Sequence, residues 1–310
     1  MKPAITIFLA LLILVLLAQI PIKDGYDLTR HQPAGVPIAA VNQTKPSFPP
    51  VDILAYAAVV VDYPEGRLIF EKNAQAPMAL ASLSKLMTAL AVRDLIGNPA
   101  ITFFARVSEE DVLMEGDSGF LVGEEFSSND LLDAMLVGSS NDAAHALART
   151  SILYDVPVSG KQPAFVELMN KKAQDLDLLS MRFFNETGLD ISASAVGALG
   201  SAGDVAKIFL LVLRDFPELL ADTKNPDIRI KSVSGRTINI KNSNNLAGTL
   251  PGLIASKTGF TDIAGGNLVL AVDIGFQNPV IIVVLGSSGQ GRFDDVLKLY
   301  EATKSYFESS

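Results

Sequence analysis

Strand patterns lie at both ends of the folded part of this chain, and helical patterns fill the region between them. Two short apolar strands are predicted at Ala57–Asp62 and Leu68–Phe70, joined by the turn residues Pro64-Glu65-Gly66. Strand patterns return only after Asp227. Strands this far apart have to bury their apolar faces together. The pattern therefore predicts an α/β (α+β) fold in which helices pack against a mixed sheet assembled from distant parts of the chain.

The middle of the chain, from about residue 98 to 214, is predicted to form an all-helical subdomain, because apolar residues recur there at helical spacing. A helix before it should run from Ser82 to about Ile96 and end at Gly97 and Pro99. The other predicted helices are Asn129–Val137, Asp142–Ser151, Ala164–Leu178, Ala202–Leu213 and a closing helix Phe293–Phe307. The later strands are predicted at Arg229–Val233, Thr237–Ile240, Leu253–Ser256, Leu268–Ile274 and Val280–Leu285.

The N-terminal residues 1–22 are predicted to be a membrane anchor or a signal segment. Every residue from Ala4 to Ala18 except Thr6 is strongly apolar, which approaches the length of about 20 residues that crosses a bilayer as a helix. Lys2 before this stretch favours an N-terminus in the cytoplasm and an exported remainder. A cleaved signal is the alternative, although Leu16 does not suit the small-residue pattern of a cleavage site. Both interpretations place the rest of the chain outside the cytoplasm.

Residues 23–50 are predicted to be a linker, and residues 51–310 the folded domain. The linker shows no sustained apolar period, and it contains Gly25, Pro33, Gly35, Pro37, Pro46, Pro49 and Pro50. Hydrophobic residues make up 49% of the chain, enough to bury a sizeable core.

Composition excludes several kinds of chemistry. The chain has no cysteine, so disulfides, thiolate nucleophiles and cysteine zinc sites are excluded. His31 and His145 are its two histidines, too few for a histidine-rich metal site or a Ser-His-Asp triad, and His145 is read as a packed or surface residue. We therefore expect no metal and no cofactor, and a hydrolase here needs a base other than histidine. The formal net charge of -9 disfavours nucleic acid as a partner.

The segment Ser82-Leu83-Ser84-Lys85 is an S-x-x-K motif at the start of a predicted helix. Residues three apart share one helical face, so the Lys85 amine can reach the Ser82 hydroxyl. A lysine normally titrates too high to act as a base, unless burial or a second cation lowers its pKa. By itself this motif is weak, because many helices carry Ser and Lys at this spacing.

Two further motifs supply the groups that such a site lacks. Ser139-Ser140-Asn141 looks like a helix cap when taken alone, but beside Ser82 it offers a second hydroxyl and a substrate-holding amide. Lys257-Thr258-Gly259 would supply the second cation, a hydroxyl for a substrate carboxylate and a close backbone approach. A lone triplet of this kind could equally be a strand running into a turn.

In order and rough spacing, the three motifs resemble those of the low-molecular-mass penicillin-binding proteins, the D-alanyl-D-alanine carboxypeptidases of the serine beta-lactamase-like superfamily. The resemblance covers about Val51 to Phe307 and includes the segments 56–72, 81–88, 140–144, 184–189 and 257–265. It implies a beta-lactamase/transpeptidase-like fold, with a mainly antiparallel sheet flanked by helices and an all-helical subdomain. Leu80, Ser84, Ser140 and Phe260 depart from residues common in the family, and none of these changes removes a reacting group.

The resemblance also implies roles for individual residues. Ser82 becomes the acyl-enzyme nucleophile and Lys85 its proton acceptor, while Ser139 and Asn141 complete a proton relay and substrate clamp. Lys257 and Thr258 bind the terminal carboxylate of the substrate, Gly259 allows close approach, and the backbone N–H groups of Ser82 and Phe260 form the oxyanion hole. The implied partners are peptidoglycan stem peptides, beta-lactam antibiotics as acylating inhibitors, and the cytoplasmic membrane through the N-terminal helix.

The function expected from this resemblance is a serine-type D-Ala-D-Ala carboxypeptidase. A D,D-endopeptidase or a beta-lactamase on the same scaffold is the enzymatic alternative, and a noncatalytic wall-binding protein is the other. A class A lactamase needs a glutamate to activate the deacylating water, and Glu167 and Glu186 lie in the right broad region. Both are interpreted as structural, as are Asp204 and Arg292.

Overall fold

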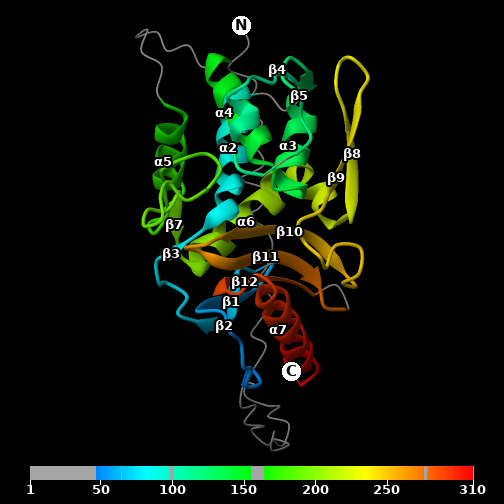
Figure 1. Ribbon diagram of the computed structural model, residues 1–310. Helices are drawn as coiled ribbons and strands as arrows, with labels where there is room; N and C mark the ends of the chain where they lie inside the picture. Colours follow the sequence, from blue (N-terminus) through cyan, green and yellow to red (C-terminus); the bar gives the residue numbers. More distant parts are fainter. Residues whose placement is uncertain are drawn as a thin grey trace, which may run out of the picture. The chain divides into compact units, whose positions relative to one another are not determined.

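Strands from both ends of the chain pair in one five-stranded antiparallel sheet of order β10-β11-β12-β1-β2 (Figure 1). Its strands are β1 Ala57–Asp62, β2 Arg67–Lys72, β10 Leu253–Thr261, β11 Gly265–Asp273 and β12 Pro279–Ser287. The join between the two ends is β1 against β12, where Ala57 faces Leu285. The predicted assembly from distant segments is confirmed. The sheet is antiparallel throughout rather than mixed.

This computed structural model describes residues 47–63, 65–97, 101–116, 118–154, 164–275 and 278–309. The predicted anchor or signal segment 1–22 and nearly all of the predicted linker 23–50 lie outside these residues. Within the described ranges, every helix is too short or too polar to cross a bilayer.

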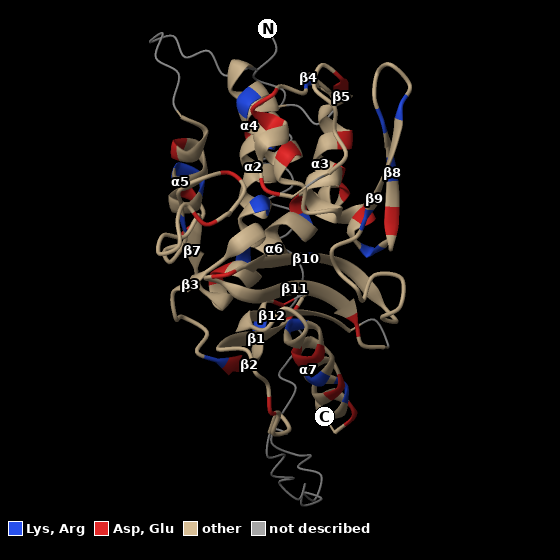
Figure 2. Cartoon of the chain, viewed as in Figure 1, with Lys and Arg blue, Asp and Glu red and all other residues tan. Residues whose placement is uncertain are grey.

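The sheet buries both of its faces, because successive strand residues point to opposite sides. On one face, Val59 and Val61 of β1 join a core shared with the helices of the middle region. On the other face, Ala58 and Val60 pack with Val296 and other residues of the C-terminal helix α7, Gly291–Glu308. Helix α7 carries charges of both signs along its length (Figure 2). The sheet is therefore a layer between the helices of the middle region on one face and helix α7 on the other, as Figure 1 shows.

Helix α2 Lys85–Ile96 precedes the middle region, which contains the other predicted helices, observed as α3 Ser128–Val137, α4 Asn141–Ser151, α5 Phe165–Asp175 and α6 Ala202–Asp215. Serine side chains accept a backbone hydrogen bond at the starts of three of them, α3, α4 and α6. Helix α2 ends at Gly97, whose φ of 69° suits glycine. These boundaries agree with the sequence patterns to within a few residues.

The region is not all-helical, because it also contains short strands that have too few residues to show a period. They are β4 Phe104–Arg106, paired with β5 Glu125–Ser127, and β6 Arg182–Phe183, paired with β7 Ala198–Gly200, which also pairs with β3 Met78–Ala79. A separate hairpin of β8 Asp227–Lys231 and β9 Thr237–Lys241 follows the helical region. The fold class predicted from the resemblance is confirmed, with this correction to the helical subdomain.

Candidate active site

Ser82 lies in a tight turn that precedes helix α2. Residues Ala81–Ser84 form a 3-10 helix, η1, and the α-helix itself begins at Lys85. Ala81 has a φ of 48°, a left-handed conformation that is strained for a residue with a side chain. The turn nevertheless keeps the predicted pairing, because the Lys85 Nζ donates to the Ser82 Oγ at 2.9 Å.

Lys85 is enclosed by neutral acceptors. Its side chain is fully buried, and its Nζ also donates to the Asn141 Oδ1 at 2.6 Å and to the Thr187 carbonyl at 2.7 Å. Burial lowers the pKa of Lys85 to about 7, and the negative charge of Glu186 opposes this shift. An amine with this pKa is about half unprotonated at neutral pH, so it can accept the proton of the Ser82 hydroxyl.

The second motif closes the site from the helical region. Ser139 is held at a φ of 62°, Ser140 caps helix α4 by accepting from the Ala143 N–H, and Asn141 is the first helical residue. The Asn141 Nδ2 donates to the Glu115 carbonyl at 2.5 Å. Asn141 therefore links Lys85 to the segment that contains Glu115.

The third motif brings a second buried amine to the site from strand β10. The Lys257 Nζ donates to the Ser139 Oγ at 2.8 Å and to the Thr258 carbonyl at 2.9 Å. Its pKa lies well below the usual lysine value, mainly because of burial and additionally because of the positive charges of Lys85 and Arg292. Lys85 is thus close enough to disfavour the charged form of Lys257.

Gly259 brings strand β10 against the nucleophile turn. A Cβ atom at this position would lie 2.8 Å from the Leu80 carbonyl oxygen and 3.3 Å from the Leu83 nitrogen, so only glycine fits without displacement. Arg292 from α7 donates to the Gly259 carbonyl at 2.7 Å, and its guanidinium lies 5.9 Å from the ring centre of Phe260. Arg292, which is interpreted from the sequence as structural, holds strand β10 against α7 through this hydrogen bond.

Sequence reasoning missed two residues that contact the site. The Ser243 hydroxyl lies 2.6 Å from the Thr258 Oγ1, and the Thr187 carbonyl accepts from Lys85. Both are in loops with no periodic pattern, so only the tertiary structure reveals them. The sequence feature nearest to Thr187 is the segment 184–189, which is part of the family resemblance but implies no role for Thr187.

The remaining candidates take part in local structure. Glu167 caps the start of α5, where its carboxylate accepts from the Ala164 N–H at 3.3 Å. Asp204 accepts from the Ser180 N–H and hydroxyl and pairs with Lys207. His145 pairs with the buried Asp111 at 2.7 Å. Across the described ranges, no group of three or more His, Cys, Asp or Glu side chains is arranged to hold a metal ion.

This fold and site define the class of the serine-reactive penicillin-binding proteins. The structure is similar to penicillin-binding protein D2 of Listeria monocytogenes in its ampicillin-bound form, with a TM-score of 0.65 and 28% identity over 82% of this chain and 98% of that one. It is also similar to the D-alanyl-D-alanine carboxypeptidase DacD of Francisella tularensis, with a TM-score of 0.71 and 26% identity over 84% of this chain and 72% of that one.

The chain belongs to the D-alanyl-D-alanine carboxypeptidase family, peptidase family S11, whose model matches residues 41–289. It is 29% identical to the D-alanyl-D-alanine carboxypeptidase DacF of Bacillus subtilis over 82% of this chain and 63% of the relative. It is 30% identical to a D-alanyl-D-alanine endopeptidase of Pseudomonas aeruginosa over 80% of this chain and 76% of the relative. The chain therefore spans less than two thirds of the length of DacF.

Proposed function

We propose that this protein is a serine-type D-Ala-D-Ala carboxypeptidase that trims peptidoglycan stem peptides through an acyl-enzyme on Ser82. The observation that carries this proposal is the buried Lys85 amine, with a pKa lowered to about 7, at 2.9 Å from the Ser82 hydroxyl. Family membership and the names of the similar proteins support the choice of substrate.

Acylation begins when the Ser82 Oγ attacks the carbonyl carbon between the two D-alanines, and its proton passes to Lys85. The negative charge that develops on the carbonyl oxygen is stabilised by the backbone N–H groups of Ser82 and Phe260. The close approach of Gly259 to the Leu83 nitrogen places β10 beside the nucleophile turn, as an oxyanion hole built from both segments requires.

The amide then breaks, and its nitrogen takes the proton that Lys85 accepted, relayed through a serine hydroxyl, so that D-alanine leaves as a neutral amine and Lys85 is unprotonated again. Ser139 is the hydroxyl suited to this transfer for two reasons. Lys257 donates to the Ser139 oxygen at 2.8 Å, and Asn141, which lies two residues after Ser139, accepts from Lys85. The remaining peptide stays bound to Ser82 as an ester. A water molecule next attacks this ester, gives its proton to Lys85, and regenerates the Ser82 hydroxyl as the shortened peptide leaves.

Substrate recognition depends on the carboxylate at the end of the peptide. The Thr258 hydroxyl can donate to it, and the positive charge of Arg292, which acts on the neighbouring Lys257, favours an anion at this end of the site. Beta-lactams carry a carboxylate beside a reactive amide, so we propose that they acylate Ser82 in the same position. The ampicillin-bound form of the similar Listeria protein supports this proposal.

The proposed location is the outer side of the cytoplasmic membrane, with residues 1–22 as the anchor and residues 23–50 as the tether. The apolar run after Lys2 supports this arrangement, and secretion after signal cleavage is the alternative. Peptidoglycan as substrate requires a catalytic domain outside the cytoplasm in either case.

The direct test is the release of D-alanine from a synthetic pentapeptide stem by the purified protein. The proposal predicts release by wild type and none by Ser82→Ala. A protein that neither releases D-alanine nor cuts cross-linked peptides would contradict the proposed activity.

A beta-lactamase on this scaffold is distinguished by how fast the penicillin ester is hydrolysed. Glu167 is occupied in capping α5, whereas Glu186 is close enough for its charge to act on Lys85. We expect the acyl-enzyme to persist for many minutes in wild type and in Glu186→Gln alike. A lifetime of seconds in wild type that lengthens in Glu186→Gln would favour the lactamase.

A further inference from the structure

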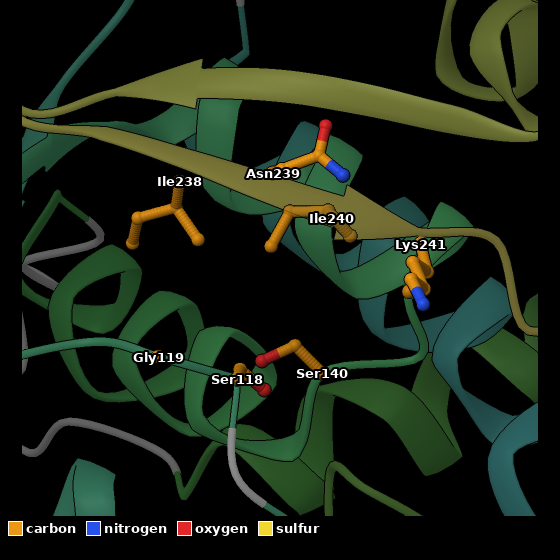
Figure 3. Close-up of a pocket in the computed structure, with 8 residues that line it drawn as sticks. Ser118, Gly119, Ser140, Ile238, Asn239, Ile240 and Lys241 are labelled. Atoms are coloured by element: carbon orange, nitrogen blue, oxygen red, sulfur yellow. The ribbon is translucent and has the colours of Figure 1, made fainter.

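A groove of about 430 Å³ lies beside the second motif, between strand β9 and the segments 118–119 and 138–140 (Figure 3). Ile238 and Ile240 form its apolar side, and Ser118, Ser140 and Lys241 add polar groups. None of the catalytic steps described above uses this groove.

The groove begins next to the carboxylate-binding end of the active site. Lys241 lies two residues before Ser243, whose hydroxyl is 2.6 Å from the Thr258 Oγ1. The backbone N–H of Ser243 also donates to the Val137 carbonyl at 3.0 Å, which ties the end of β9 to the residues just before the second motif. The Lys241 end of the groove is therefore adjacent to Thr258.

This position fixes which part of a substrate can reach the groove. The scissile carbonyl has to lie at Ser82 and the carboxylate of the leaving group at Thr258, so the groove lies beyond the leaving group. A free terminal D-alanine ends at its carboxylate and its methyl group. A longer leaving group, in which the amine is carried by a second peptide, continues past Thr258 along β9.

The lining of the groove suits a peptide that carries an acidic group. Lys241 is exposed and forms no ion pair with another described residue, although Asp227 lies opposite it in the β8–β9 register. An ammonium group without an ion pair among the described residues at one end, and the exposed edges of two largely buried isoleucines along the side, match a carboxylate attached to an aliphatic chain.

We propose that this groove is a subsite for the leaving-group peptide of a cross-linked substrate, and that Lys241 binds a carboxylate on that peptide. The proposal rests on the serine peptidase function and specifies its substrate: a D-alanyl amide whose amine belongs to a second peptide. Ser82 attacks the same carbonyl carbon, the bond to the second peptide's nitrogen breaks, and that nitrogen takes the proton. Water then hydrolyses the ester on Ser82, which separates the two strands.

The test compares two substrates with the full-length protein: a pentapeptide stem that ends in D-Ala-D-Ala, and a purified cross-linked dimer of stem peptides. The variant is Lys241→Glu, and the matched control is Lys231→Glu, an exposed lysine on the same hairpin that does not line the groove. Thermal unfolding of all three proteins checks that the hairpin is intact.

Wild type should cleave both substrates. In Lys241→Glu, the ratio of kcat/KM for the dimer to kcat/KM for the monomer should fall about fivefold, the size of one exposed ion pair. The effect should appear mainly as a higher KM for the dimer, and Lys231→Glu should keep the wild-type ratio.

Two results overturn the subsite. If wild type releases D-alanine but leaves the dimer intact, the subsite is excluded while the proposed function stands. If Lys241→Glu keeps the wild-type ratio of kcat/KM values, the subsite is likewise excluded and the proposed function again stands. A protein that cleaves neither substrate and takes up no penicillin contradicts the proposed function itself.

Discussion

The Ser243 hydroxyl lies 2.6 Å from the Thr258 Oγ1, and it is also within 3.2 Å of the Val137 carbonyl. A carbonyl can only accept, so Ser243 is the donor to Val137, whereas either oxygen can be the donor in the contact between the two hydroxyls. For Thr258 to donate to a substrate carboxylate, as proposed, Ser243 has to turn its proton towards the Thr258 oxygen. Ser243 is thus placed to position the hydroxyl that is proposed to recognise the end of the peptide.

Removing the Ser243 hydroxyl should weaken recognition of the carboxylate specifically. Ser243→Ala should lower kcat/KM for a peptide ending in D-alanine by about tenfold, the value of one lost hydrogen bond at the upper end of its range. The same peptide with a terminal carboxamide should be cleaved equally by wild type and variant, and Ser243→Thr should restore most of the activity. Equal losses on both peptides would indicate a merely structural role.

The pH dependence of acylation should follow Lys85. Its protonated amine cannot accept the Ser82 proton, so the rate should rise with pH and level off above a midpoint near the lowered pKa of about 7. Stopped-flow acylation by a penicillin across neutral pH measures this midpoint. A rate that rises only near the usual lysine pKa of about 10.4 would show that Lys85 is not desolvated in solution.

His145 should make the protein less stable towards alkaline pH. Its hydrogen bond to Asp111 raises the pKa of His145, the negative charge of Glu186 adds to this, and burial together with Arg149 opposes it. A raised folded-state pKa stabilises the protein fully below the unfolded value of about 6.5, and this stabilisation is lost as the pH rises through the folded value.

Urea unfolding of His145→Gln measures this linkage. The variant should lose more free energy of unfolding relative to wild type at about pH 5 than at about pH 8.5. A loss that is the same at both pH values would show that the charge on His145 does not contribute.

A side chain at residue 259 should separate the two halves of the oxyanion hole. Gly259→Ala would place a Cβ 2.8 Å from the Leu80 carbonyl oxygen, which forces β10 away from the nucleophile turn. We expect kcat to fall about 100-fold or more, as when one oxyanion donor is lost, with a smaller change in KM. Unchanged acylation in a folded variant would exclude this close approach from the mechanism.

Much of the fold could be predicted because its strands and helices are long enough to show their periods. Helix α6 and strand β12 differ from their predicted ranges by at most two residues at either end. That strands from both ends of the chain share one sheet follows from the burial of strand faces, whereas the specific pairing of β1 with β12 is known only from the structure. Strand β10 was predicted to end at Ser256 but continues to Thr261, because the polar side chains of Lys257 and Thr258 interrupt the apolar pattern.

The proposed catalytic groups follow from motif chemistry, whereas the contacts that support them do not. The spacing of Ser82 and Lys85 indicated a shared helical face, whereas Ser82 in fact lies in the 3-10 turn before the α-helix. Neither Ser243 nor Thr187 could be found from the sequence, because each lies in a loop without a periodic pattern and makes its contact across the tertiary fold, with a residue 15 positions away for Ser243 and 102 positions away for Thr187. Such contacts depend on how the sheet and helices pack.

The most direct test of the central claim is labelling by a fluorescent penicillin, followed by denaturing gel electrophoresis. Wild type should be labelled covalently, and Ser82→Ala should not. Ser84→Ala is the matched control, because the Ser84 hydroxyl is buried without a hydrogen-bond partner in the described part of the chain, and it should be labelled like wild type. Equal labelling of wild type and Ser82→Ala would contradict the assignment of Ser82 as the nucleophile.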